Sequence, residues 1–426
     1  MFLLPSQLYT EIHGTLHHPV VNVLRVSSEM ILFMKQFRFA ALFLALCLPF
    51  LISCISTEIE AAQPLPDPFQ SYLRQGIEKT LNLEIPIARE SMQKAVELDR
   101  ENPSGYAFLA FVELFSYEMS FEQKDRENHQ AAMLRYVSET LIRGGKRIEK
   151  SSKDGQAYFA MALAKIVKVR WAIEQKNYFI IVQDTSDILD YCEKVKKENP
   201  NHYDIYFLTG LLHYHIAHLP ALSRFISSLL ITSGNHQKGL QELELAAHRG
   251  DLLKEFAQAE LSSVYEYFEK KPEQALPIIR GLKEKFPLNY RFLFTLAGTL
   301  SDLDRFDEAF ATTREIEKGF QVGKSPFVHQ LRPRFDQLMG HIYSDQKEYA
   351  KAADYFQRAL KDTAAYNART RASALTGLGM IHDVRKERKQ AEDYYSRALQ
   401  VKGGEGAAQV EARQYLKTPY VPLPKH

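Results

Sequence analysis

The chain has 426 residues and a formal net charge of +2, and 45% of its residues are hydrophobic while 25% are charged. This composition is ordinary for a folded protein and excludes general disorder, and the near-neutral charge gives no electrostatic case for nucleic-acid binding. The three cysteines, Cys47, Cys54 and Cys192, are too few for a disulfide framework.

The N-terminal region has the layout of an export signal, although it begins some way into the chain. A short positive segment precedes an uncharged apolar run at 39–52. We therefore expect 34–54 to be a signal peptide. Residues 1–33 are expected to be a non-structural extension that comes from an upstream start codon, with translation beginning at Met30 or Met34.

The apolar run ends in leucine, isoleucine, serine and Cys54, an order that resembles the bacterial lipobox. The resemblance implies cleavage before Cys54 and lipid attachment to it. Since no aspartate follows, it implies the outer membrane, with the body facing the periplasm. Two alternatives remain: an incidental cysteine in a soluble exported protein, or an uncleaved anchor at 39–55, because about seventeen residues is the lower limit for spanning a bilayer.

After a proline-rich linker at 55–68, helices are expected to begin near Phe69. The first pair has small and bulky residues at a fixed spacing: Tyr72, Gly76, Ala88, Met92 and Ala95. The following region, 104–200, is predicted to be helical without that spacing, with long helices near 127–150 and 156–175.

A later pair is interrupted by an apolar insertion. Its first helix is expected around Tyr206, Gly210 and His213, and its second around Gly239, Leu243 and Ala246. The insertion itself, 222–233, has two interpretations. It is either a helix folded into the groove of the array or a patch that faces a membrane or a partner.

The spacing is clearest towards the end of the chain. It is Gly-x2-Tyr-x8-Ala-x3-Phe-x2-Ala from Gly340 to Ala359, and it returns from Gly379 to Ala398 with a histidine and a tyrosine at the bulky positions. Small residues let two antiparallel helices approach closely, while bulky residues fill the same faces. This pattern resembles the tetratricopeptide repeat, a roughly 34-residue helix-turn-helix unit. The clearest repeats are predicted at 257–287, 291–318, 334–361 and 373–400.

The resemblance implies an all-α fold, a solenoid of antiparallel helix hairpins that extends over 69–416 with about ten to thirteen helices. A last helix from Ala407 to Leu416 would cap it, and 417–426 is a proline-rich tail. The block from Tyr203 to Asn289 is also similar to bacterial exported repeat proteins of unassigned role, and more distantly to repeat proteins of the mitochondrial outer membrane.

In such a solenoid the first helix of each pair lines the concave surface where partners bind. The resemblance then places a partner-binding groove at Glu260, Tyr267, Arg291, Phe294, Arg334, Gln337 and His341. Arginine, aromatic and amide side chains together would suit a peptide segment. The alternative is that these are simply exposed polar positions on a helix.

Two clusters suggest metal chemistry, but each has a simpler explanation. His213, His215 and His218 are metal-ligand types, yet the first two point about 200 degrees apart on a helix, which favours ordinary packing. Three aspartates at 302, 304 and 307 alternate as in a calcium loop, but the turn glycine and the terminal glutamate are missing, so a turn between helices is favoured. We expect no metal site.

The chain has no phosphate-binding, dinucleotide-binding or nucleophile-elbow pattern, and Cys192 is expected to be a small buried hydrophobe. We therefore expect no catalytic residues, no cofactor and no enzyme activity. The interpretation is a scaffold for protein-protein interactions at the cell envelope, with an unknown protein or peptide partner. The alternative is a ligand-binding accessory subunit of an envelope transport or assembly system, which an enclosed pocket near 206–233 would favour; a hydrolase using the histidines ranks third.

Overall fold

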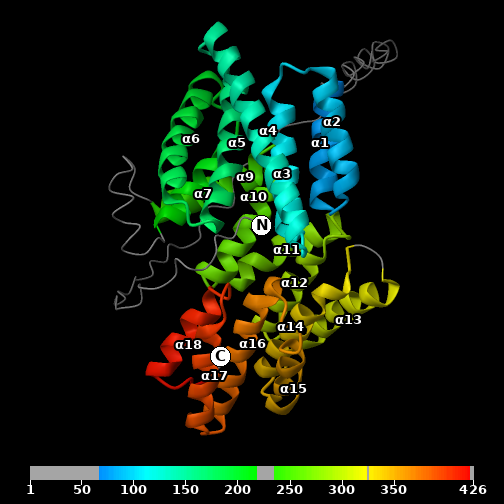
Figure 1. Ribbon diagram of the computed structural model, residues 1–426, viewed down its shortest axis with the longest axis vertical. Coiled ribbons are helices and arrows are strands. Elements are labelled where there is room, and N and C mark those ends of the chain that lie inside the picture. The colour runs from blue at the N-terminus through cyan, green and yellow to red at the C-terminus, as the bar shows by residue number, and fades with distance from the viewer. Residues whose placement is uncertain (1–66, 218–234, 324–325, 423–426) are drawn as a thin grey trace, which may run out of the picture. The chain divides into compact units, whose positions relative to one another are not determined.

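The computed structural model describes residues 67–217, 235–323 and 326–422, and from Pro68 onward these belong to one compact unit. They form seventeen α-helices and no strand (Figure 1). The all-α prediction is confirmed. The expected number of ten to thirteen helices is wrong, because most of the helices in the second half span only 10 to 17 residues.

The first half of the unit contains α1 (Pro68–Leu81), α2 (Ile85–Leu98), α3 (Pro103–Met119), α4 (Gln123–Lys150), α5 (Gly155–Glu174), α6 (Tyr178–Glu198), α7 (Ile205–Ala217) and α9 (His236–Arg249). The second half contains α10 (Lys254–Ser263), the π-helix η2 (Val264–Phe268), α11 (Pro272–Lys285), α12 (Tyr290–Asp302), α13 (Phe306–Val322), the 3₁₀-helix η3 (His329–Leu331), α14 (Arg332–Asp345), α15 (Tyr349–Ala359), the 3₁₀-helix η4 (Ala365–Asn367), α16 (Ala368–Val384), α17 (Arg388–Gln400) and α18 (Ala407–Lys417). Successive helices pack as hairpins, and α18 packs against α16 and α17 at the end of the array.

The spacing of small and bulky residues is explained by close helix approach inside each hairpin. A Cβ atom built on Gly340 would lie 2.5 Å from the ring of Phe356, and one built on Gly76 would lie 2.5 Å from the Met92 methyl group. Any side chain at these glycines would therefore collide with the facing helix. The repeat spacing is thus a packing requirement between the two helices of one hairpin.

The turns inside the hairpins share one backbone conformation. Six non-glycine residues have φ angles between 54° and 64°, at Leu83, Lys176, Lys270, Asp304, Lys347 and Lys386. In the α14–α15 turn, Glu348 N–H donates to Tyr343 O at 2.8 Å and Lys347 N–H donates to Ser344 O at 2.9 Å, which is a Schellman motif. Asp304 lies in the same kind of turn between α12 and α13, so the turn predicted there is confirmed.

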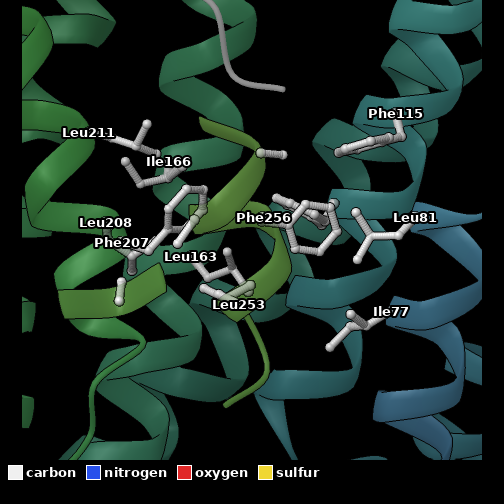
Figure 2. Packing of buried hydrophobic residues seen from close by; sticks show 14 of the residues in the cluster. Ile77, Leu81, Phe115, Leu163, Ile166, Phe207, Leu208, Leu211, Leu253 and Phe256 are labelled. Carbon is white, nitrogen blue, oxygen red and sulfur yellow. The ribbon is translucent and has the colours of Figure 1, made fainter. Parts of the chain in front are cut away.

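Packing extends beyond neighbouring hairpins, because α3 contacts α10 far along the sequence. The ring of Phe256 in α10 packs against the rings of Phe111 and Phe115 in α3, with centroids 4.6 and 5.5 Å away. Figure 2 shows Phe115 and Phe256 in this core. Helix α3 also packs against α2, α4 and α5, and it is buried without interruption from Pro103 to Tyr117. In this half of the unit, the first helices of the hairpins, α1, α3, α5 and α7, pack against each other.

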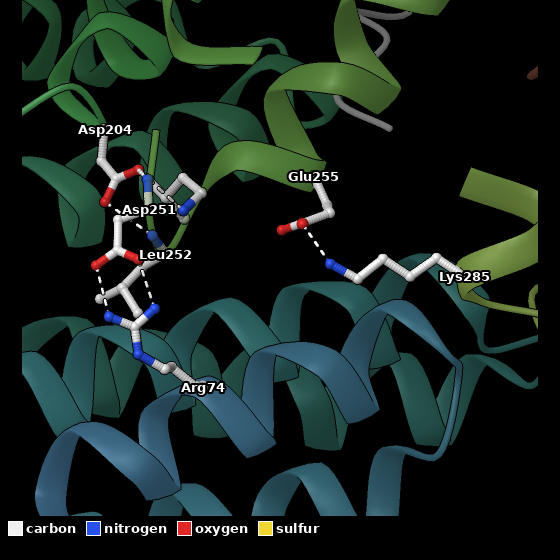
Figure 3. Close-up of polar contacts among 7 residues, drawn as sticks. Arg74, Asp204, Asp251, Leu252, Glu255 and Lys285 are labelled. Carbon is white, nitrogen blue, oxygen red and sulfur yellow. Dashed lines mark hydrogen bonds and ion pairs between the residues drawn. The ribbon is translucent and has the colours of Figure 1, made fainter. Parts of the chain in front are cut away.

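Polar contacts also join α1 to later elements. The Asn289 side chain donates to Leu81 O at 2.6 Å. Asp204, which is 3% exposed, accepts the backbone N–H groups of Asp251, Leu252 and Leu253 at 2.7 to 3.1 Å (Figure 3). These bonds hold the loop between α9 and α10. Asp251 of this loop also pairs with Arg74 of α1, whose Nη2 donates to Asp251 Oδ2 at 2.7 Å (Figure 3).

The described residues contain no helix that is both long and apolar enough to cross a membrane. Four predicted features lie wholly or almost wholly outside these residues: the extension at 1–33, the signal peptide at 34–54 with Cys54, the linker at 55–68 except its last two residues, and the insertion at 222–233. The long helices predicted near 127–150 and 156–175 correspond to α4 and α5.

Candidate functional site

The first helices of three successive hairpins, α12, α14 and α16, contact one another in order. Polar side chains link them. Gln337 Nε2 donates to Ser373 Oγ at 3.1 Å, His341 Nε2 lies 3.0 Å from the same oxygen, and Ser301 Oγ donates to Asp345 Oδ2 at 2.7 Å. We call this surface the inner face of α12, α14 and α16.

Arg334, at the start of α14, is a cation without a described acidic partner on this face. Its guanidinium lies over the ring of Phe294, 5.1 Å from the centroid. Burial lowers the pKa of Arg334, and the positive charge of Arg291 lowers it further, while no ion pair with Arg334 occurs within 67–217, 235–323 and 326–422. A cation in such surroundings is stabilised when a ligand brings a negative charge to it.

Tyr267 lies beside this arginine on the π-helix η2. Its side chain is 43% exposed, yet the surrounding protein raises its pKa to about 12, the charge of Glu266 contributes in the same direction, and Arg334 opposes the shift. Tyr267 is therefore an exposed aromatic side chain close enough to Arg334 for their charges to interact. π-helices are frequent at functional sites.

Three more of the predicted groove residues remain partly accessible on this face: Arg291, Gln337 and His341. Arg291 lies 3.8 Å from Glu118 Oε2, which is at the limit of an ion pair. Burial lowers the pKa of His341 to about 4, so its imidazole is neutral at physiological pH. The face offers two arginines, an amide and a neutral imidazole, and η2 adds the phenol of Tyr267.

The structure places the other two predicted groove residues in the core. Glu260 has no exposed area and its Oε1 lies 2.8 Å from His215 Nε2, while Phe294 is 5% exposed. The physical reason is the packing of α10 and α12 among other helices, which repeat spacing alone does not reveal. Neither side chain is available to a partner, so both are removed from the candidate groove.

Sequence reasoning missed a buried glutamate next to this face, which is paired with the exposed Asp302. Glu266 of η2 is 6% exposed and accepts a hydrogen bond from Thr299 Oγ1 at 2.9 Å. Burial, and then hydrogen bonding with Asp302, raises the pKa of Glu266 to about 8, so it holds a proton at neutral pH. A glutamate within an otherwise apolar helix face was the signal available in the sequence.

The predicted histidine cluster is divided between two carboxylates. His213 Nδ1 lies 2.6 Å from Glu242 Oε2, and His215 faces Glu260. His218 lies outside the described residues, and within those residues no group of three or more metal-ligating side chains is placed to hold a metal ion. Cys192 is 2% exposed and burial raises the pKa of its thiol, as expected of a small buried residue.

Comparisons with known proteins agree with the hairpin geometry. Residues 337–361, which cover most of α14 and α15, match the family described as tetratricopeptide repeat. The chain matches no curated protein.

Among solved structures, a tetratricopeptide repeat protein from Parabacteroides merdae is 16% identical, with a TM-score of 0.31 over 72% of this chain and 99% of that chain. The P58(IPK) TPR domain is 16% identical, with a TM-score of 0.23 over 82% of this chain and 100% of that domain. Yeast Tom70 is 11% identical, with a TM-score of 0.26 over 82% of this chain and 97% of that chain. At such low scores these likenesses carry no argument about function. The chain therefore contains a tetratricopeptide repeat at 337–361, set in an array of hairpins with the same close-packed spacing.

Proposed function

We propose that this protein is a non-catalytic interaction scaffold whose inner face of α12, α14 and α16 binds an extended, acidic segment of a partner protein. The observation that supports the proposal is Arg334, a partly accessible cation over an aromatic ring with no described acidic partner. A carboxylate from the partner would supply the missing negative charge.

The neighbouring side chains suit this role. Tyr267 is exposed beside the arginine, and buried arginine and tyrosine contacts provide much of the binding free energy in protein interfaces. Since the helices that hold these side chains are packed against one another before binding, little scaffold ordering is lost when a segment binds.

The test is selection of peptides from a random display library on the full chain, followed by affinity measurement. We expect the selected peptides to be enriched in aspartate and glutamate, and Arg334→Ala to weaken their binding by about tenfold or more, since one charge-assisted hydrogen bond is lost. Arg397→Ala is the matched control, because this arginine lies on the outer helix α17 with its side chain half exposed. Peptides without acidic enrichment, or equal binding by Arg334→Ala, would overturn the proposal.

Cell-envelope attachment is a further part of the proposal, and the sequence around Cys54 supports it. Signal cleavage and acylation of Cys54 would tether the scaffold to the outer membrane through the linker. Intact mass of the protein from a membrane fraction tests this. A diacylglyceryl-modified Cys54 terminus that disappears in Cys54→Ala is expected, and an unmodified terminus at Met30 or Met34 would indicate an uncleaved anchor instead.

A further inference from the structure

A small pocket lies between α6, α7 and α9, away from the inner face of α12, α14 and α16. Its volume is about 120 Å³, well below the roughly 300–1,000 Å³ that suits drug-sized ligands. Helix α6 contributes Cys192, Glu193 and Lys196, and α7 contributes Ile205 and Thr209. Only a small molecule fits a space of this size.

The floor of the pocket is buried and contains an unsatisfied polar group. Cys192 and Ile205 are each 2% exposed, and Thr209 is 7% exposed. Within the described part of the chain, Thr209 Oγ1 is buried without a hydrogen-bond partner. Buried hydroxyl groups are normally paired, so this one favours a ligand with a polar atom over an empty or purely apolar pocket.

The rim carries charges of both signs. Glu193 and Lys196 are exposed on the same face of α6, and among the described residues neither takes part in an ion pair. From α9, Glu242 is held by His213 at 2.6 Å, and the half-exposed Lys238 lies 3.9 Å from Glu242, at the limit of an ion pair. Among the described residues, the rim therefore has one carboxylate, Glu193, and one ammonium group, Lys196, without an ion pair; Lys196 Nζ lies over the Tyr206 ring, 5.7 Å from its centroid.

We propose that this pocket binds a small zwitterion, a free amino acid with a short side chain. Its carboxylate would face Lys196 and Lys238, its ammonium group would face Glu193, and its side chain would enter towards Ile205 and Thr209. A ligand with only one charge would leave one of the rim charges unpaired. This proposal does not depend on peptide binding at the inner face of α12, α14 and α16.

The experiment is isothermal titration calorimetry on the full chain with L-alanine and L-serine as probes. Acetate and methylamine, which carry one charge each, serve as control ligands. We expect binding of the two amino acids, and weaker binding by about tenfold or more for Lys196→Met, since a charged contact is lost. Thr209→Val, which keeps the side-chain shape and removes the hydroxyl group, is expected to weaken L-serine more than L-alanine.

Lys197→Met is the matched control variant, because Lys197 is an exposed lysine next to Lys196 that does not line the pocket. Unfolding temperatures without ligand show whether each variant is folded. The absence of heat with both amino acids on the unmodified chain would overturn the proposal. So would equal binding by Lys196→Met and Lys197→Met, or binding of acetate as tight as that of L-alanine.

Discussion

Replacing Glu266 with glutamine removes a carboxyl group that the folded protein holds in its protonated form. Glutamine keeps an oxygen for the hydrogen bond from Thr299 and an amide group that can donate to Asp302. The substitution therefore changes titration more than packing. We expect Glu266→Gln to be as stable as the unmodified chain in acid and more stable in mild alkali.

The magnitude follows from the pKa of Glu266, which rises from its ordinary value of 4.5 to about 8 on folding. At roughly 1.4 kcal/mol per pH unit, this shift corresponds to at most about 5 kcal/mol. The folded state binds the Glu266 proton more tightly than the unfolded state does. The contribution of this proton to the free energy of unfolding is therefore fully present below pH 4.5 and is lost as the pH rises to about 8. The difference between variant and unmodified chain should grow across this window.

Urea unfolding of both proteins between about pH 5 and about pH 9 measures this difference. Other titrating groups, such as His341, are present in both chains, so their effects cancel in the comparison. Glu273→Gln is the control, because Glu273 is exposed on α11. A constant difference between Glu266→Gln and the unmodified chain over the whole range would refute a protonated Glu266.

Three further predictions concern packing and backbone geometry. Gly340→Ala should destabilise the protein by about 1–3 kcal/mol, because the new Cβ meets Phe356. Gly281→Ala on α11 should stabilise it by about 0.5–1 kcal/mol, because the new Cβ meets nothing within 4 Å. Urea unfolding midpoints that move in the same direction for both variants would contradict this explanation. Asn289→Ala should lower the free energy of unfolding by about 1–3 kcal/mol and increase hydrogen exchange in α1, because the bond to Leu81 O is lost. Unchanged exchange in α1 would show that the contact of Asn289 with Leu81 does not hold this helix. Lys347→Gly, at a φ angle of 63°, should raise the melting temperature through relief of up to about 1 kcal/mol of strain, and a lower melting temperature would argue against a left-handed turn.

The sequence alone was sufficient for the hairpins of the second half. The pairs that define their spacing, such as Gly340 with Phe356, lie sixteen positions apart within one hairpin, so a local pattern reveals them. The same pattern located a helix pair around Gly76 and Met92, and the glycines at 403–406 marked the start of the final helix α18. It also identified Arg334 and Tyr267 as surface candidates, because inner-helix positions follow from register.

Only the tertiary structure decided which of those candidates solvent reaches. The contacts of α3 with α10, and of Asn289 with Leu81, join segments far apart in the chain, and the second contact spans 208 positions. No periodic pattern in a sequence encodes such a separation, since it depends on how each hairpin is rotated against the next. Those rotations buried Glu260 and Phe294, whereas Arg334 remained partly accessible without a described acidic partner.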